Sequence, residues 1–584
     1  MKKDDKLSNL RHTLAHLLAA SVGEIYKFDK IKITLGPVVD NGFYYDIDFG
    51  EEKVSDTDLK KIEDVMRKRL PKWTQWEHKE ISKEEALKFF KNEYKVELIN
   101  EIADRGEKIT TYTCGGFTDL CRGGHLKNPS QEIDPQCFKL DRVAGAYWRG
   151  DEKNKMLTRI YGLAFETKEE LDAYILQQEE ARKRDHRKIG KEQDLFVFSD
   201  LIGSGMPMFT PKGSIIRNAI INFSRELNAE LGFGEVHTPN FNKAELFKIS
   251  GHYEKYKEDM LTVRSQYSEE DFFLKPMNCP QHTQIYASRP RSYRDLPIRY
   301  SDFANLYRDE RPGELNGLTR LRCFCQDDGH SFCREDQVKQ EFENILGVIK
   351  KALTTYGMNY KIRLSLWDPE KKEKYLGDVK DWETSQLILE SILNENKIEY
   401  EKAVGEAAIY GPKMDIITKD SLGREWQIST IQLDFIMPQR FKLTYNDKDG
   451  KEKTPVMIHR AIVGSPERFL GILIEHYAGN FPLWLAPVQV KVIPVRTNHN
   501  EYAKQVFDLL KERDIRVELD DAEENLGGKV RDAKNNKIPY WIVVGDKEIE
   551  ANKVTLESRD NGQLGQISKE ELLKKLLDEI NDKK

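Results

Sequence analysis

The chain between Pro297 and Cys333 has the sequence of a long-looped β-hairpin. Two strand-like stretches flank the segment RPGELNG, and a turn-rich segment between two strands is typical of a hairpin loop. Side chains alternate across a strand, so one face of the first strand carries Leu306, Arg308 and Glu310. If the second strand extends far enough, one of its faces carries a cationic, aromatic and polar set: Arg320, Arg322, Phe324, Gln326, Asp328 and His330.

This polar face favours a binding surface. An arginine guanidinium pairs with phosphate through two parallel charge-assisted hydrogen bonds, and a phenylalanine on the same face can stack on a base. The alternative interpretation is a solvated outer face whose charges bind nothing. The pattern by itself leaves both interpretations open.

Composition limits the class of protein. A chain of 584 residues with 39% hydrophobic and 33% charged residues predicts a globular protein of about three domains. The net charge of −6 does not exclude a nucleic-acid ligand, because a local basic groove matters more than the sum. Seven scattered cysteines argue against a disulfide framework and for a reducing compartment. No apolar run approaches the roughly 18 residues of a membrane span, and the N-terminus lacks a signal peptide, so we expect a cytoplasmic protein without a membrane partner.

Two pairs of potential ligands lie far apart in the first part of the chain. An alanine- and leucine-rich helix predicted at 9–26 carries His12 and His16 one turn apart. The later segment TYTCGGFTDLCRGGH carries three more groups: Asp119, Cys121 and His125. The two histidine and cysteine pairs have the spacing of a zinc site, but they can also orient water and relay protons for hydrolysis. Two unrelated pairs are the third interpretation.

The highly charged stretch at 166–190 predicts a solvated linker helix. Its basic part, RKRDHRK, is also suited to contact the phosphates of a nucleic acid. A new unit follows, with an amphipathic helix at 215–230 and a short strand that ends at Pro239.

Cysteines and histidines also cluster in the middle of the chain. Alternation along a strand predicted in DFFLKPMNCPQH places Met277 and Cys279 on one face, although a lone cysteine is usually a small buried hydrophobe. Cys323, Cys325 and Cys333 lie near His330 in sequence and suggest zinc, but alternation turns Cys323 and Cys325 away from that histidine.

Short antiparallel strands are expected at 405–418 and 423–441. They carry Tyr410, Gln427 and Gln432, which are compatible with ordinary polar strand faces. Arg468 follows the start of a helix predicted at 465–475. From residue 484, helix and strand patterns alternate and predict a separate domain with a mixed or parallel sheet.

Three segments together resemble the class II aminoacyl-tRNA synthetases, and specifically the threonyl family: YRDE with TRLRCFCQDDGH, KPMNCPQH, and VMIHRAIVGSPERFLGILIE. RHTLAHLL and CRGGH resemble the editing domain of that family. The resemblance implies an α+β multidomain protein with an N-terminal α+β editing domain, an antiparallel-sheet catalytic core and a C-terminal α/β anticodon-binding domain. The expected boundaries are 1–165 for editing, 166–190 for the linker, 191–483 for catalysis and 484–584 for the anticodon.

The resemblance also implies roles for individual residues. The zinc ligands are Cys279, His330 and His459, which leave a fourth position open. The ATP-binding residues are Arg308, Glu310, Arg320, Phe324, Gln427 and Arg468. The threonine-binding residues are Met277, Arg308, Gln326, Asp328, Tyr410 and Gln432. The editing residues are His12, His16, Asp119, Cys121 and His125, and Pro239 matches the proline of the dimer motif.

The implied activity is a threonine–tRNA ligase that uses ATP, Mg²⁺ and one zinc ion, acts on tRNA(Thr) as a homodimer and hydrolyses mischarged seryl-tRNA(Thr). By resemblance, the zinc takes the amino and hydroxyl groups of L-threonine together. Valine has no hydroxyl, whereas serine lacks only a methyl group, which is worth about 1–3 kcal/mol. Such a site excludes valine but accepts some serine, so a second, hydrolytic site is needed.

The sequence departs from the family pattern at two places. The editing helix begins within the first dozen residues, so we expect that the small N-terminal domain of bacterial members is absent. The anticodon-binding domain differs at 523–528 and at Glu557, and anticodon contacts are therefore not assigned. Two other classes stay open: a different class II ligase such as a prolyl enzyme, and a regulator that keeps the fold without the chemistry.

Overall fold

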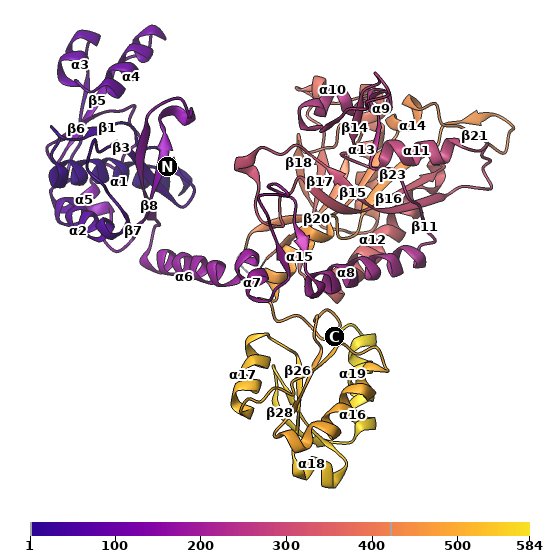
Figure 1. Cartoon of the computed structure of the whole chain (residues 1–584). Helices are drawn as coiled ribbons and strands as arrows, with labels where there is room; N and C mark the ends of the chain where they lie inside the picture. Colours follow the sequence, from indigo (N-terminus) through magenta and orange to yellow (C-terminus); the bar gives the residue numbers. More distant parts are fainter. Residues whose placement is uncertain (1–2, 421–422) are drawn as a thin grey trace. The chain divides into compact units, whose positions relative to one another are not determined.

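The computed structural model describes residues 3–420 and 423–584. The chain divides into two compact units, residues 1–179 and 180–584 (Figure 1). The division falls within α6 (Lys168–Arg184), inside the expected linker. Among the described residues, no helix is long and apolar enough to cross a membrane.

The first unit packs the long helix α1 (Lys3–Tyr26) against an antiparallel sheet. That sheet has the path β1 (Lys32–Ile33), β3 (Gly42–Asp48), β8 (Met156–Ala164), β7 (Phe138–Tyr147). A second small sheet contains β4 (Glu77–Glu80), β5 (Thr110–Cys114) and β6 (Phe117–Leu120). The apolar face of α1, from Leu10 to Val22, is buried, as the alanine- and leucine-rich pattern predicts.

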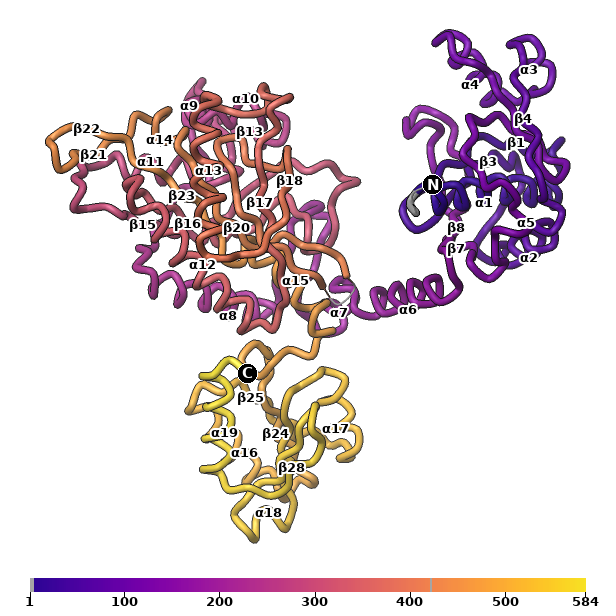
Figure 2. Tube along the Cα trace, turned by 180° about the vertical axis from the view of Figure 1, so that it is seen from behind, coloured from indigo at the N-terminus to yellow at the C-terminus, as the bar shows by residue number. Residues whose placement is uncertain are grey.

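The second unit is built on an eight-stranded, mostly antiparallel sheet. Its order is β11 (Gly234–Glu235), β15 (Ile298–Tyr307), β16 (Cys323–Cys333), β23 (Val456–Ala461), β20 (Glu425–Asp434), β19 (Lys413–Lys419), β17 (Tyr360–Leu366), β18 (Glu401–Val404). Helices α8 (Pro211–Glu230) and α12 (Val338–Thr355) lie on one side of it, and α9 (Ala244–Ser250) and α10 (His252–Tyr256) lie on the other (Figures 1 and 2). Helix α15 (Pro466–His476) packs against β16 and α8.

The last part of the chain contains a second, mixed sheet. Strand β24 (Val490–Pro494) pairs in parallel with β25 (Val517–Leu519) and β26 (Tyr540–Val544). Antiparallel strands β27 (Val554–Ser558) and β28 (Gly562–Ile567) complete the sheet. Helices α16 (Asn500–Lys511), α17 (Leu526–Asn535) and α19 (Lys569–Asn581) accompany it. The predicted mixed α/β sheet and the predicted α+β fold class are confirmed.

The predicted hairpin forms, but its strands are shorter than alternation suggested. β15 ends at Tyr307, so Arg308 and Glu310 lie beyond it, and β16 begins at Cys323, so Arg320 and Arg322 precede it. The backbone N–H of Arg322 donates instead to Gly205 O at 2.9 Å. A distant segment therefore takes over the hydrogen bond that would continue the second strand.

Two other local predictions are wrong. Cys279 does not lie on a strand: β14 ends at Leu274, and Cys279 is the first residue of α11 (Cys279–Ala287). Pro280 follows it within the first turn, where the fixed φ of proline suits a helix start. The linker is two helices, because Asp185 ends α6 and caps α7 (His186–Glu192) by accepting the Arg187 N–H at 2.8 Å.

A buried ion pair joins three of these elements. Arg460 on β23 is 1% exposed and donates to Asp327 Oδ1 on β16 at 2.6 Å and to Asn228 Oδ1 on α8 at 2.6 Å. Asp327 also accepts the backbone N–H groups of Ile462 and Val463 at 3.2 and 3.3 Å. A side chain at the neighbouring Gly329 would clash, because its Cβ would lie 2.4 Å from the guanidinium carbon.

We expect Arg460→Met to lower the free energy of unfolding by about 3–5 kcal/mol, because it leaves the Asp327 carboxylate buried without its partner. Thermal unfolding followed by circular dichroism measures the effect. The matched control is Arg225→Met, which breaks an exposed pair with Glu235 and costs about 1 kcal/mol or less. Equal losses in the two variants would contradict the importance of the buried pair.

Candidate functional site

The sheet register places two histidines side by side on the face opposite α8 and α12. His330 on β16 pairs directly with His459 on β23, and His459 pairs with Gln432 on β20. His330 Nε2 lies 3.0 Å from His459 Nδ1. The predicted ligand pair is therefore brought together by strand pairing alone.

Cys279 completes this cluster from the start of α11. The three ligand atoms of Cys279, His330 and His459 all lie within 4.8 Å of one another, and all three residues are buried. Burial raises the pKa of the Cys279 thiol and lowers that of His330. Cys325 is buried on the other face of β16, so the rival cysteine cluster does not form around His330.

Two residues that the sequence analysis did not single out orient these histidines. His459 Nε2 lies 2.9 Å from Asp434 Oδ2, which leaves Nδ1 directed at His330. His330 Nδ1 lies 2.7 Å from His282 Nδ1. Such outer partners fix the tautomer and ring orientation of metal-binding histidines. His282 stands within KPMNCPQH and Asp434 two residues after Gln432, but their partners could be known only from the sheet register.

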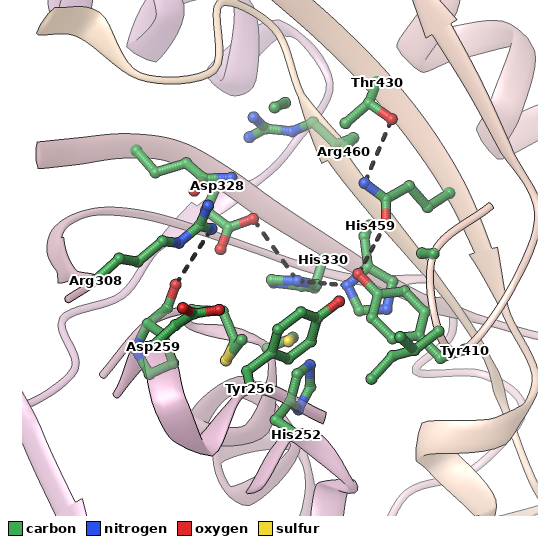
Figure 3. Close-up of a pocket in the computed structure, with 18 of the residues that line it drawn as sticks. His252, Tyr256, Asp259, Arg308, Asp328, His330, Tyr410, Thr430, His459 and Arg460 are labelled. Carbon is green, nitrogen blue, oxygen red and sulfur yellow. Dashed lines mark hydrogen bonds and ion pairs between the residues drawn. The ribbon is translucent and has the colours of Figure 1, made fainter. Parts of the chain in front are cut away.

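A cavity of about 630 Å³ opens above the cluster (Figure 3). Its wall contains the predicted threonine-binding residues Met277, Arg308, Gln326, Asp328, Tyr410 and Gln432. The Tyr410 hydroxyl donates to Gln432 Oε1 at 2.8 Å, and its ring stacks on His459 at 4.5 Å. Asp328 accepts from Asn278 at 3.1 Å, and burial raises its pKa. His252 and Tyr256 also line the cavity, and no pattern in the sequence indicated them.

A second cavity of about 470 Å³ adjoins the first. The predicted ATP-binding residues line it: Arg308, Glu310, Arg320, Phe324, Gln427 and Arg468. Arg308 and Gln326 line both cavities. Burial lowers the pKa of the Arg308 and Arg468 guanidinium groups, and the Arg308 guanidinium lies 5.2 Å from the centre of the Phe324 ring. Arg320 is held by Glu310 and Glu314 at 2.8 and 2.7 Å.

The first unit contains a separate cavity of about 510 Å³. His12, His16, Asp119 and Cys121 line it. His12 Nε2 lies 3.2 Å from His16 Nε2 and 3.5 Å from Cys121 Sγ, and His125 Nε2 lies 3.4 Å from the same sulfur. The structure therefore brings together the two pairs that are more than 100 positions apart, and the interpretation as unrelated pairs is wrong.

Buried partners surround this group. The Lys95 ammonium donates to Asp119 Oδ1, the Tyr45 hydroxyl donates to Asp119 Oδ2 at 2.5 Å, and His16 Nδ1 lies 3.3 Å from the same oxygen. Trp76 stacks on His125 at 3.9 Å. Lys95 lies on α4 (Glu93–Asp104) among other charged residues, and its sequence context carries no signal of this role.

Charge is separated within this group. Burial lowers the pKa of His16, but Asp119 and Cys121 outweigh it and raise the value to about 9. Burial raises the pKa of Cys121, but hydrogen bonds from His12, His125 and His16 lower it to about 3. The site thus favours a thiolate beside an imidazolium, a pair suited to holding a polar substrate and moving protons.

Comparison with known families gives matches in three segments of the chain. Residues 256–477 match the tRNA synthetase class II core domain (G, H, P, S and T), residues 489–579 match an anticodon binding domain, and residues 109–161 match the threonyl and alanyl tRNA synthetase second additional domain. With the antiparallel sheet and its two adjoining cavities, these matches define a class II aminoacyl-tRNA synthetase.

Similar proteins and structures identify the family within this class. The threonine–tRNA ligase of Deinococcus radiodurans is 48% identical over 94% of this chain and 85% of its own length, and that of a Thermus thermophilus strain is 45% identical over 100% and 90%. A structure described as the RNA binding domain of threonyl-tRNA synthetase from Cryptosporidium parvum Iowa II superposes with a TM-score of 0.65 at 36% identity, covering 68% of this chain and 98% of that chain. A putative threonyl-tRNA synthetase from Aeropyrum pernix gives 0.61 at 28% identity, with 68% and 97% covered. The chain belongs to the threonine–tRNA ligase family.

We expect Cys121 to be the cysteine that iodoacetamide labels first near pH 6. The other six cysteines lie within the described ranges, and burial raises the pKa of each. Only the thiolate reacts, so the Cys121 rate should stay nearly constant between about pH 5 and 8. Peptide mass spectrometry measures the rate, with Cys121→Ser as the control. A rate that rises about tenfold per pH unit would contradict the thiolate.

Proposed function

We propose that this chain activates L-threonine with ATP as threonyl-adenylate, transfers the threonyl group to tRNA(Thr) and hydrolyses mischarged seryl-tRNA(Thr). The observation that carries the proposal is the buried Cys279–His330–His459 cluster at the base of one cavity, with Arg308 lining both that cavity and the next. An amino acid above the cluster and a nucleotide in the second cavity would meet at Arg308.

The residues suit their proposed roles. Arg308 bridges the carboxylate of the amino acid and the α-phosphate, and it stabilises the charge that develops during attack. Gln326, Asp328, Tyr410 and Gln432 position the amino acid. Phe324, Glu310, Gln427 and Arg468 hold the nucleotide, with Arg320 on the triphosphate. Release of Arg320 from Glu310 and Glu314 accompanies nucleotide binding, and Mg²⁺ bound with ATP screens the phosphates.

The donor set fits one zinc ion. Two neutral imidazoles and one cysteine sulfur are zinc ligands, and three protein ligands leave a position for substrate. Asp434 and His282 hold the two imidazoles with their ligand nitrogens facing each other. When bound, zinc supplies a Lewis-acid position for the amino and hydroxyl groups of threonine. Selection by the hydroxyl excludes valine more strongly than an apolar pocket would.

This site also accepts some serine, and the first unit hydrolyses the mischarged seryl-tRNA(Thr) that results. The imidazolium of His16 and the thiolate of Cys121 hold the seryl ester and exchange protons with water, while Asp119 fixes His16 and Lys95. A bound metal ion is the second candidate function of this site, because the four ligand atoms of His12, His16, Cys121 and His125 lie within 4.8 Å of one another. The hydrolytic role uses the Cys121 thiolate and the His16 imidazolium without a metal ion, and the iodoacetamide experiment tests the thiolate.

Three further properties belong to the proposal. The chain is divided into the four segments expected from the sequence, with the linker at 166–190. A homodimer rests on the likeness around Pro239, whose carbonyl oxygen accepts from Gln281 at 2.7 Å, and equilibrium sedimentation tests it. The cytoplasm, where tRNA and ATP are available, suits the seven cysteines, which all lie in the described part of the chain and are free there.

ATP–pyrophosphate exchange tests the ligase. We expect exchange with threonine, weaker exchange with serine and none with valine or proline. Cys279→Ser should lower threonine exchange by about 100-fold or more and reduce bound zinc, which elemental analysis measures. The control is Cys323→Ser, which alters the opposite face of β16. Strong exchange with valine, or full activity of Cys279→Ser, would refute the role of the metal site.

Hydrolysis of seryl-tRNA(Thr) tests the editing site. We expect Asp119→Asn to slow this hydrolysis by about 100-fold, because His16 and Lys95 lose their shared carboxylate. Threonine-dependent exchange should be unchanged. Asp134→Asn, an exposed carboxylate in the same unit, is the matched control. Unchanged hydrolysis in Asp119→Asn would place the editing chemistry elsewhere.

A further inference from the structure

A buried histidine outside both cavities contacts the loop that carries Arg320. His186 is the first residue of α7, directly after the helix that runs from the first unit into the second, and it is 2% exposed. Helices α7 and α15 lie side by side in both views of the chain (Figures 1 and 2). The His186 ring lies between α15 and the return arm of the hairpin loop.

Both ring nitrogens of His186 have partners. The backbone N–H of Leu318 donates to Nε2 at 3.0 Å, so this nitrogen is the acceptor. Nδ1 therefore carries the proton and donates to Glu475 Oε1 at 2.7 Å. Burial lowers the pKa of His186 to about 4, which keeps the ring neutral, and the two hydrogen bonds select this tautomer.

The loop is shaped around this ring. Gly317 has φ +48°, and a Cβ there would lie 2.1 Å from His186 Nε2. On α15, a Cβ at Gly471 would lie 3.3 Å from the Leu318 Cβ. Leu318 is fully buried, and Leu318, Thr319 and Arg320 are consecutive residues of the nucleotide cavity. Leu318 is thus fixed by one hydrogen bond to the α7 histidine and by close packing on α15.

We propose that His186 is a positioning residue for nucleotide binding: it holds the Leu318 backbone and thereby the arm of the loop that presents Arg320 to the triphosphate. This inference rests on the proposed function, because the nucleotide cavity is its target. The ring does not touch the nucleotide. Its contribution passes through two peptide units, from Leu318 to Arg320.

Two substitutions of His186 by amide side chains test the two hydrogen bonds of its ring one at a time. In His186→Gln, the side-chain amide reaches the place of Nε2 and can accept the Leu318 N–H while losing the bond to Glu475. In His186→Asn, the amide stays near the place of Nδ1 and can donate to Glu475 but leaves the Leu318 N–H without an acceptor. A buried unpaired donor costs more than a hydrogen bond adds.

The measurement is ATP–pyrophosphate exchange with the KM for ATP and the KM for threonine determined separately, together with hydrogen exchange of the peptide that contains Leu318. We expect His186→Asn and His186→Ala to raise the KM for ATP by about tenfold and to speed exchange at Leu318, with the KM for threonine unchanged. His186→Gln should stay within about twofold of the parent chain in both readouts. Thermal unfolding identifies any variant that fails to fold, and the Asn and Gln pair then decides.

The opposite order would overturn the inference. If His186→Asn behaves like the parent chain and His186→Gln does not, the bond to Glu475 matters and the loop contact does not. Equal increases of both KM values with a lower melting temperature would show a structural role only. Absence of exchange in the folded parent chain with any amino acid would refute the proposed function itself, whereas an active parent with unchanged variants refutes only the role of His186.

Discussion

The packing of the catalytic sheet depends on a buried ion pair. Arg460 is buried on β23, and its guanidinium is stabilised by Asp327 on the neighbouring strand β16 and by Asn228 on α8. A buried Arg460 guanidinium or Asp327 carboxylate without its partner would be strongly destabilising. The two strands and the helix must therefore pack together in one arrangement. Gly329 leaves the space that the guanidinium needs. The buried guanidinium of Arg460 therefore links β23 with β16 and α8.

The same pair sets the geometry on the other face of the sheet. His459 and Arg460 are neighbours on β23, so they point to opposite faces, and the register that brings Arg460 to Asp327 also brings His459 opposite His330. A slip of one residue would exchange the two faces and bury the imidazole where the guanidinium belongs. The positions of two metal-ligand candidates thus follow from the Arg460–Asp327 ion pair, whose charged groups lie on the other side of the sheet.

Sequence periodicity correctly predicted which side chains share a face within a single strand. Alternation correctly grouped Phe324, Gln326, Asp328 and His330 on one face of β16 and turned Cys325 away from them. It failed where a partner from elsewhere ends a strand, as the Gly205 carbonyl does at Arg322. It could not identify His282, Asp434 or Lys95 either, because each acts on a residue that only the fold brings near. Residues whose role is to orient another residue leave no periodic signal of their own.

The two kinds of site differ in how they use charge. Around His330, burial keeps the imidazole neutral, which leaves a lone pair available to a metal ion. Around His16, a buried carboxylate and a thiolate overcome burial and keep the imidazole charged. A neutral, metal-binding surface suits recognition of a hydroxyl and an amine, and a charged one suits proton transfer to an ester. A site that selects threonine by its hydroxyl distinguishes serine only by one methyl group, which is a weak difference. The proposed function therefore requires both environments, and each unit contains the residues suited to one of them.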